Sequence, residues 1–287
     1  MAFPRICADG ERPVSNGRAS VPERPMSGFA AFVWTAAVFM TEQVCVAMTE
    51  RARTGARTDI VSLTGCTILA TSLAVFFIAR VHAPDRSLRA TLGLRPLGIL
   101  PAALSLAAGA GLRPLFGTLE GMIARRWPLQ DAEAMESVQR LVSSSSRAAL
   151  VVGVFVVTPV AVEVFFRGIL FGEVRRSGSR GRALLLTTAL FALYSTAAAD
   201  ARDLPTAALA GLAFGWLRLR TGTVVAPVAA HLAYWAVEVV PILRGGDLLA
   251  DVVYPTRWMA AGAVIAVLAL AAVGWGGADE ENSDSSS

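Results

Sequence analysis

Two charged residues lie one helical turn apart inside the apolar stretch TPVAVEVFFRGILFG. Glu163 precedes Arg167 by four residues, which is the favourable order for an ion pair along one helix face. A lone charge inside a membrane costs roughly 2.5–3.5 kcal/mol on insertion, and pairing offsets part of that cost. Pro159 lies one turn earlier and frees the carbonyl of Phe155, so a kink is expected. The pattern predicts either an ion pair beside a polar cavity or a buried pair that only fixes helix register.

His231 begins the segment HLAYWAVE in a later apolar stretch. Trp235 and Glu238 follow it by one and two helical turns, so the three residues share one helix face. His231 is therefore either a hydrogen-bonded packing residue or part of a site. Glu238 is expected either to pair with His231 or to reach the membrane interface near Arg244.

Three further features have a structural and a functional interpretation. Glu42, beside Gln43, either faces the same interior as Glu163 or rests against serine and threonine hydroxyls. His82 is expected in a solvated loop. Gly211 and Gly215 have the small-xxx-small spacing that lets membrane helices approach closely, which predicts packing rather than chemistry.

The composition predicts that these residues lie in a membrane protein. Of 287 residues, 54% are hydrophobic and 17% are charged, whereas soluble domains carry about 25% charged residues. Because the apolar residues come in long blocks, a DNA-binding module, a disordered scaffold and a disulfide-stapled domain are excluded. All 26 basic residues are arginines and the formal charge is +4, which suits anionic lipid headgroups and gives no clustered basic face for nucleic acid. Cys7, Cys45 and Cys66 are interpreted as packing residues.

A helix needs about 20 mostly apolar residues to cross the hydrocarbon core. The fold class predicted is therefore an all-α polytopic bundle of about eight transmembrane helices. The eight stretches are residues 28–48, 60–80, 97–118, 148–171, 183–199, 204–219, 222–243 and 256–275.

The same pattern divides the chain into four parts. Residues 1–27 form a polar N-terminal segment with no cleavable signal, and residues 28–147 hold the first helices. Within the latter, 119–147 is expected to be a loop or an amphipathic helix on the membrane surface. Residues 148–275 form the second membrane region. Residues 276–287 are predicted to be a disordered acidic tail.

The orientation prediction depends mainly on one basic loop. Residues 175–182 form a short loop between two predicted helices and contain four arginines. Short arginine-rich loops of membrane proteins face the cytoplasm. Counting helices outward from this loop places both termini in the cytoplasm. The location predicted is an integral protein of the bacterial inner membrane.

Residues 148–243 resemble the CAAX-protease and bacteriocin-processing (CPBP) intramembrane proteases, also called the abortive-infection family. Members of this family have the motifs EExxxRG, FxxxH and HxxxN on successive helices. Here the corresponding stretches are VEVFFRG, FALYS and GLAFGWLRLRTGTVVAPVAAHLAYW. The order and spacing of the last stretch match the family through Gly211, Gly215, Arg220, Thr221, Gly222 and His231.

The resemblance also shows where this chain departs from the family. The family's first Glu and its FxxxH histidine are implicated in activating water, and the final His and Asn in binding the oxyanion. The surviving motif positions, and hence the candidate catalytic residues, are Glu163, Arg167 and His231. The first Glu is replaced by Val162, the FxxxH histidine by Ser195 and the final Asn by Trp235. Neither Val162 nor Trp235 can accept a proton from water or stabilise an alkoxide, and Ser195 is a poor base.

The resemblance implies a membrane-anchored protein or peptide as the partner, together with the lipid bilayer and no nucleic acid. The chain is predicted to be a catalytically degenerate member that binds such a segment. The alternative is an active divergent protease that uses Glu163 and His231. A small-solute transporter is disfavoured because no inverted repeat is visible. No cofactor is predicted; a divalent metal enters only through the resemblance, and the absence of HExxH argues against a zincin-type site.

Overall fold

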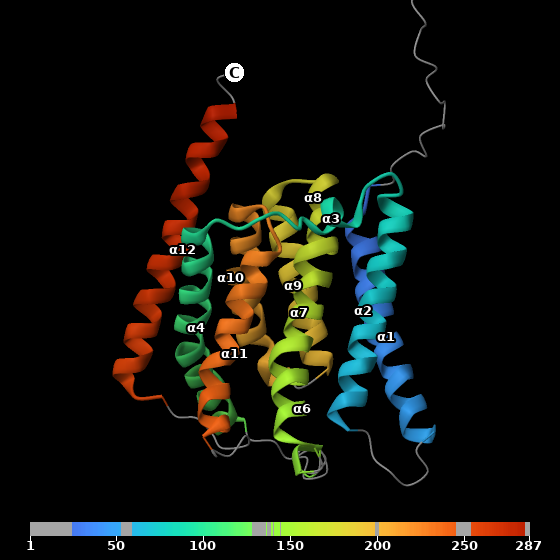
Figure 1. The fold of residues 1–287 in the computed structure, drawn as a ribbon, viewed down its shortest axis with the longest axis vertical. Helices are drawn as coiled ribbons and strands as arrows, with labels where there is room; N and C mark the ends of the chain where they lie inside the picture. Colours follow the sequence, from blue (N-terminus) through green and yellow to red (C-terminus); the bar gives the residue numbers. More distant parts are fainter. Residues whose placement is uncertain are drawn as a thin grey trace, which may run out of the picture.

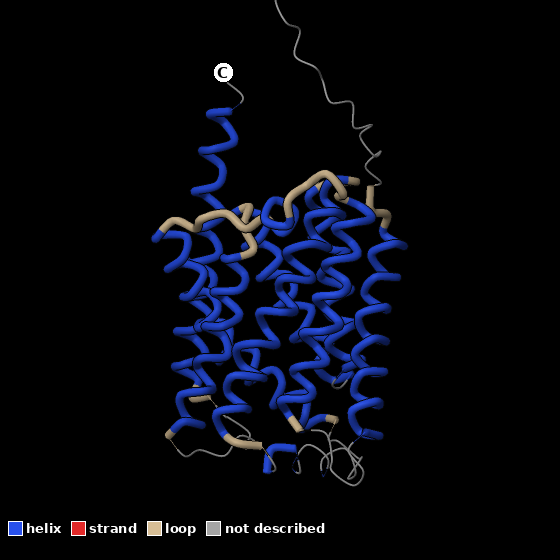
Figure 2. Tube along the Cα trace, turned by 45° about the vertical axis from the view of Figure 1, so that its right-hand side comes forward, coloured by secondary structure: helices blue, strands red, loops and turns tan. Residues whose placement is uncertain are grey.

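The computed structural model describes residues 25–52, 59–127, 145–198, 201–244 and 254–284, with isolated residues between 136 and 143. Within these ranges every regular element is a helix (Figures 1 and 2). The predicted all-α fold class is confirmed. Most of the N-terminal segment and most of 119–147 beyond Trp127 lie outside the described residues.

The helices follow one another as an antiparallel bundle whose members lie roughly along one axis (Figure 1). Two elements are π-helical (η1 and η2) and one is a short 3₁₀ turn (η3). The elements are α1 (Gly28–Ala52), α2 (Ile60–His82), α3 (Leu88–Leu92), α4 (Ile99–Arg126), α6 (Arg147–Val152), η1 (Gly153–Val157), α7 (Thr158–Glu163), η2 (Val164–Leu170), α8 (Phe171–Arg176), α9 (Arg180–Ala198), η3 (Ala201–Asp203), α10 (Leu204–Thr221), α11 (Val225–Leu243) and α12 (Thr256–Asp284).

Each of the eight predicted stretches contains helix, although fewer helices in the described part of the chain are by themselves long and apolar enough to be candidate membrane spans. In the described part of the chain, the helices long and apolar enough to cross a membrane are Gly28–Ala52, Ile60–His82, Ile99–Arg126, Arg147–Arg176 and Thr256–Trp275. Val225–Val240 is a shorter apolar helix. The all-α membrane bundle is thus confirmed, and the exact count of eight is not.

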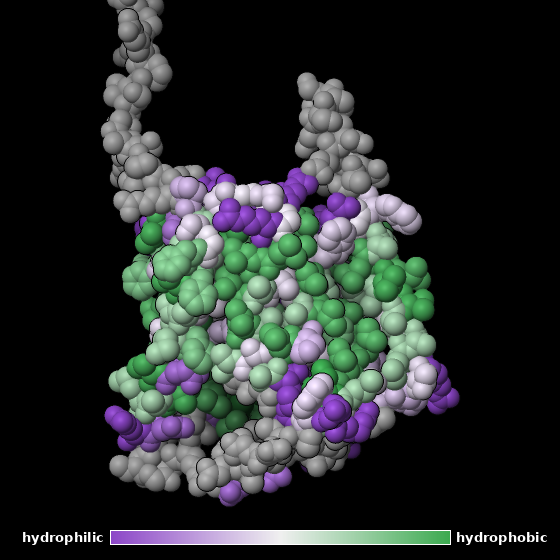
Figure 3. Space-filling view, turned by 180° about the vertical axis from the view of Figure 1, so that it is seen from behind, coloured by the Kyte–Doolittle hydropathy of each residue, from purple (hydrophilic) through white to green (hydrophobic). Residues whose placement is uncertain are grey.

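The outer surface of the bundle is apolar around its middle. Figure 3 shows a band of hydrophobic side chains between two ends where hydrophilic side chains gather. Large side chains such as Phe29, Ile99 and Val267 are exposed by 77%, 91% and 65%. In water such a surface would be unfavourable, whereas a lipid bilayer covers it without cost.

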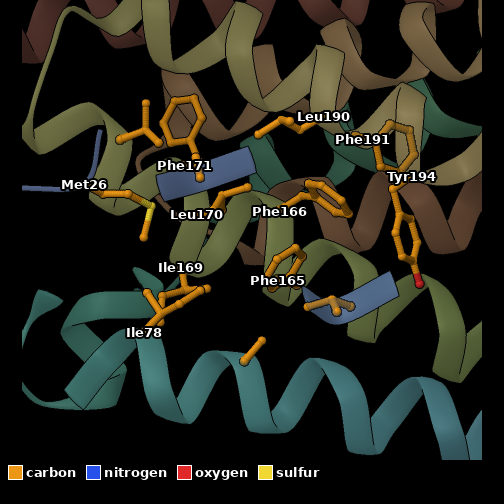
Figure 4. Close-up of a cluster of buried hydrophobic side chains, with 14 of the residues drawn as sticks. Met26, Ile78, Phe165, Phe166, Ile169, Leu170, Phe171, Leu190, Phe191 and Tyr194 are labelled. Atoms are coloured by element: carbon orange, nitrogen blue, oxygen red, sulfur yellow. The ribbon is translucent and has the colours of Figure 1, made fainter. Parts of the chain in front are cut away.

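Two hydrophobic cores lie on either side of the central span Arg147–Arg176. One joins α1, α2 and α9 to the elements α7, η2 and α8 of the central span, and the other joins α4, α10, α11 and α12. In the first core, Phe166 lies 5.5 Å, between ring centroids, from both Phe191 and Tyr194, while Ile169 lies toward Ile78 (Figure 4). The central span also contacts α11 of the second half, through Glu163 with His231 and Phe155 with Trp235, and it holds the largest fully buried side chains.

Small residues set the closest helix approaches, as the Gly211 and Gly215 spacing predicted. A Cβ added at Gly215 would crowd Leu184, and one at Gly211 would press on Thr188. The pair therefore packs α10 against α9. Helix α4 makes a still closer approach through Gly109, whose added Cβ would overlap the backbone carbonyl of Ala230 in α11.

Three expectations about element ends need correction or extension. Helix α4 continues through the predicted start of the loop at residue 119, because Glu120 is held by Arg113 two turns earlier at 3.0 Å. His82 is not in a solvated loop: it ends α2, is 8% exposed and accepts a hydrogen bond from the indole of Trp34 at 3.3 Å. Helix α12 extends through Asp284 into the segment 276–287 predicted to be disordered, since propagating an established helix is easy.

Candidate functional site

The central span carries the first candidate residues on an irregular helix. Elements α6, η1, α7, η2 and α8 are continuous, and η1 and η2 are π-helical segments on either side of α7. The N–H of Thr158 donates to the carbonyl of Gly153, five residues earlier, immediately before Pro159. The distortion predicted from Pro159 thus takes the form of a π-helical turn. Such segments inside helices are frequent at functional sites.

Glu163 and Arg167 form the predicted ion pair, and both side chains have no exposed surface. The distance between Arg167 Nη1 and Glu163 Oε1 is 3.2 Å. Arg167 Nη2 also donates to the carbonyl of Gly211 at 3.3 Å, and the guanidinium lies 4.2 Å from the centroid of the Phe191 ring. The arginine is therefore fixed by α7, α9 and α10 together.

His231 completes this cluster from α11. Its Nδ1 lies 2.9 Å from Oε1 of Glu163, and the ring lies against Phe214 at a centroid distance of 4.8 Å. When Glu163 is ionised it can only accept, so Nδ1–H donates and the imidazole is fixed in orientation. The three surviving motif residues, 163, 167 and 231, are thus brought together, although His231 is 68 positions from Glu163.

A cavity of about 360 Å³ lies next to the cluster. It is enclosed by parts of α1, α4, η1, α7, α9, η3, α10 and α11. All three substituted positions, Val162, Ser195 and Trp235, line it, as does the ring of His231. Glu163 does not line it and has no exposed surface, and its Oε2 accepts no hydrogen bond among the described residues. The cavity therefore meets the replaced side chains rather than the surviving carboxylate.

Glu42 reaches the cavity from α1 and also bonds to hydroxyl groups. It accepts hydrogen bonds from Thr67 and, at 2.6 Å, from the phenol of Tyr194. The two interpretations left open by the sequence are therefore both met. With two donors already in place, this carboxylate is held as part of the wall.

A second buried charge cluster centres on Arg113 of α4, which the sequence analysis missed. Arg113 Nη1 lies 2.5 Å from the phenol oxygen of Tyr234 and 3.0 Å from Glu120, and Nη2 pairs with Glu238. Glu238 thus pairs with neither His231 nor Arg244. Arg113 lies inside the predicted stretch 97–118, so the signal was an arginine within an apolar block, two turns before an acid.

Trp235 fills the remaining space between the two clusters. Its ring lies 5.2 Å from Phe155 and 5.3 Å from the Arg113 guanidinium. Arg113 also approaches Tyr254 in the segment before α12, where burial raises the pKa of the phenol and keeps it protonated. These ring contacts hold the indole of Trp235 in place.

The donor set does not fit a catalytic zinc centre. Such a centre takes three protein ligands, and among the described residues no three side chains of His, Cys, Asp or Glu are grouped in this way. Glu163 and His231 supply two donors, and the guanidinium of Arg167, 3.2 Å from the carboxylate, would repel a divalent cation. No step involving a metal is therefore derived.

The comparisons with known proteins agree with the motifs. The family model described as "type II CAAX prenyl endopeptidase Rce1-like" matches residues 144–237, about a third of the chain. No curated protein and no solved structure matches the chain. The matched residues contain α7, η2, α9, α10 and most of α11, which carry the cluster and most of the cavity lining; α1 and α4, which also contribute to the lining, lie outside the match. The resemblance to the CPBP family is therefore confirmed over residues 144–237: this part of the membrane bundle is similar to the type II CAAX prenyl endopeptidases.

Proposed function

We propose that this CAAX-protease-like membrane protein holds a segment of a membrane-anchored protein in the 360 Å³ cavity and does not cleave it. The observation that carries the proposal is the composition of the cavity wall. The positions where the family presents a carboxylate, an imidazole and an amide are occupied by Val162, Ser195 and Trp235.

Hydrolysis requires a base within hydrogen-bond reach of a water molecule beside the scissile carbonyl. Val162 offers no lone pair, and the hydroxyl of Ser195 is a weak base. Glu163 is shielded from the cavity, and its Oε1 already accepts hydrogen bonds from Arg167 and His231. Losing a general base costs about 10²–10⁴ in rate, and losing an oxyanion donor about 10²–10³.

Binding a peptide requires a pocket of suitable volume and lining but no catalytic base, and the cavity provides such a pocket. Its volume is within the range of ligand pockets, about 300–1,000 Å³, and its wall combines apolar and aromatic side chains with polar ones, three carboxylates among them. Phe191, Phe214 and Tyr234 form much of that wall. Such a surface favours an apolar anchor and leaves the polar residues to orient a peptide.

One observation favours the second candidate, a divergent protease that uses Glu163 and His231. The carboxylate orients the imidazole through Nδ1, and the histidine ring lines the cavity. A histidine held in this way presents Nε2 as its remaining lone pair, as in acid–histidine catalytic pairs.

A fluorescent, prenylated peptide ending in a CAAX-type sequence separates the two candidates. The full chain in neutral detergent is expected to bind the peptide by fluorescence anisotropy and to give no shorter product by mass spectrometry. Cleavage by the wild type that disappears in His231→Ala would establish the protease instead, and the absence of both binding and cleavage would reject both candidates.

A cavity-filling variant provides the matched test of where the peptide binds. Ala207 lines the cavity from α10, so Ala207→Trp is expected to weaken peptide binding about tenfold or more, equivalent to roughly 1.4 kcal/mol. Leu193 on α9 is 53% exposed on the outer surface, so Leu193→Trp is the control and should leave binding unchanged. Equal binding by both variants would place the peptide elsewhere.

A further inference from the structure

A second cavity, of about 530 Å³, lies at the end of the bundle where α8 turns into α9. Seven arginines from the 83–98 connection, α8, α9 and α10 line it, among them Arg95, Arg175 and Arg218. The lining contains one acid, Glu173, which is held by Arg176 at 2.8 Å. The wall therefore carries a formal charge of about +6 before any ligand is bound.

Arg218 is the most constrained of these side chains. It is 5% exposed, its Nε donates to the carbonyl of Arg167 at 2.7 Å, and its guanidinium lies 5.7 Å from the Phe171 ring centroid. Among the described residues its two terminal nitrogens make no hydrogen bond. The charged groups that act on it are Arg175 and Arg95, which have the same sign. A nearly buried cation surrounded by cations is unfavourable unless an anion joins it.

The backbone around Arg218 is fixed before any ligand arrives. Gly93 and Gly222 line the cavity in the left-handed conformation, each with φ of 66°, and a side chain at Gly93 would overlap the guanidinium of Arg218. Thr223 Oγ1 donates to the carbonyl of Arg95 at 2.9 Å and accepts from its N–H at 3.4 Å. These contacts tie the 93–95 turn to the end of α10, so the site is preorganised.

We propose that this arginine cavity binds a phosphate group, with Arg218 as the central donor. A planar guanidinium can give two parallel hydrogen bonds to phosphate, and clusters of arginines are a recurrent way to bind it. Several arginines around one cavity also match the charge of a phosphomonoester or pyrophosphate better than that of a single carboxylate. The group is carried either by an anionic lipid headgroup or by a soluble phosphate compound.

The location makes both sources accessible. The cavity is lined by residues around α3, α8 and the start of α9. These elements meet at one end of the bundle (Figure 1), and hydrophilic side chains gather at the ends, beyond the apolar band (Figure 3). A lipid headgroup sits at this level when the acyl chains lie along the bundle. A soluble phosphate would enter from the aqueous side. This site is separate from the cavity of the proposed function and does not depend on it.

The experiment uses the full chain in neutral detergent with two arms. In the first, inorganic phosphate and pyrophosphate are titrated by isothermal calorimetry. In the second, mixed micelles supply phosphatidylglycerol or zwitterionic phosphatidylcholine, and native mass spectrometry counts the lipid retained. Binding of soluble phosphate identifies a soluble ligand, and selective retention of phosphatidylglycerol identifies a headgroup. Binding in neither arm would overturn the proposal.

Variants locate the binding to the cavity. Arg218→Gln and Arg95→Gln are expected to weaken binding about tenfold or more, as loss of a charged hydrogen-bond donor does. Arg182→Gln is the control, because Arg182 is an exposed arginine at the same end that does not line the cavity. If Arg218→Gln does not fold, the test is made with Arg95→Gln, which changes an exposed side chain. Equal losses of binding in Arg95→Gln and Arg182→Gln would show that the charge of the whole face, and not this cavity, attracts the anion, and unchanged binding in Arg95→Gln would overturn the proposal.

Discussion

A carboxylate without exposed surface is stable only when hydrogen-bond donors surround it, and Glu163 has two of them. Arg167 and His231 both reach Oε1, from its own helix and from α11. Arg167 is itself held by the Gly211 carbonyl and by the Phe191 ring. The ion pair therefore connects four helices, because its atoms contact α7, α9, α10 and α11.

Removing one member of this pair is expected to destabilise the protein more than removing both. Arg167→Leu leaves Glu163 as a buried charge with one partner fewer, at a cost of about 3–5 kcal/mol. The double change Glu163→Leu with Arg167→Leu removes both charges and should recover a large part of that loss. Thermal unfolding of the purified variants in detergent measures the difference, and Arg182→Leu at an exposed position is the control.

Equal unfolding temperatures for the single and double variants would contradict this prediction, because they would show that neither charge stabilises the other in the buried site.

The sequence predicted this pair but not the one formed by Arg113 and Glu238. Glu163 and Arg167 are four residues apart on one helix, so helical geometry alone brings them together. Arg113 and Glu238 are 125 positions apart, and their contact exists only once α4 packs against α11. The sequence likewise gave no reason to join His231 to Glu163, apart from the resemblance. Local spacing could be predicted, whereas contacts made by helix packing could not.

Close packing of α4 depends on residues that lack a side chain. At Gly109 the backbone of α11 passes so near that a Cβ would overlap the Ala230 carbonyl, and Gly111 meets Gly262 of α12 in the same way. Because Ala230 precedes His231, the distance between α4 and α11 also fixes where the histidine ring lies. The Gly-xxx-Gly spacing at Gly211 was the one such contact visible in the sequence.

Substitution at Gly109 tests this dependence. Gly109→Ala is expected to lower the stability of the bundle by about 1–3 kcal/mol, because the overlapping atom belongs to a backbone that cannot move aside cheaply. Gly65→Ala in α2 is the matched control, since an added Cβ there has no atom within 4 Å. In a helix interior alanine is favoured over glycine by about 1 kcal/mol, so the control should be unchanged or more stable. Stabilisation by Gly109→Ala, measured by thermal unfolding, would contradict the close approach.

The positions of the helices could be predicted from the apolar blocks in the sequence, but the residues at which the helices end could not. All eight predicted stretches contain helix, because roughly 20 apolar residues have few other structures in a membrane. The π-helical segments η1 and η2 could not be predicted, since they depend on how the central span packs between α2 and α11. Nor could the length of α4, which continues past residue 118 because Glu120 finds a partner.

In the molecule as a whole, the charged clusters lie at two different depths along the bundle axis. The Glu163 and Arg113 clusters are enclosed within the bundle, whereas the arginine cavity opens at one end. The start of α1, the turn between α8 and α9, and the end of α12 lie at this same end (Figure 1). The Ser177 hydroxyl donates to the carbonyl of Met26 at 2.5 Å, which fastens two of these segments together. The geometry is therefore compatible with an orientation in which both termini and the basic turn share one side.

That side is predicted to be the cytoplasm, because arginine-rich short loops are retained there during insertion. Reporter fusions after Ser179 and after Ser287 should both report the cytoplasm, and a fusion after Arg202, in the connection at the opposite end, should report the exterior. The three fusions are measured together, since an inverted protein would reverse all of them and a misfolded one would give no consistent pattern. An exterior signal at Ser179 would also remove the cytoplasm as the source of a phosphate for the arginine cavity, because residues 175–180 form part of its wall.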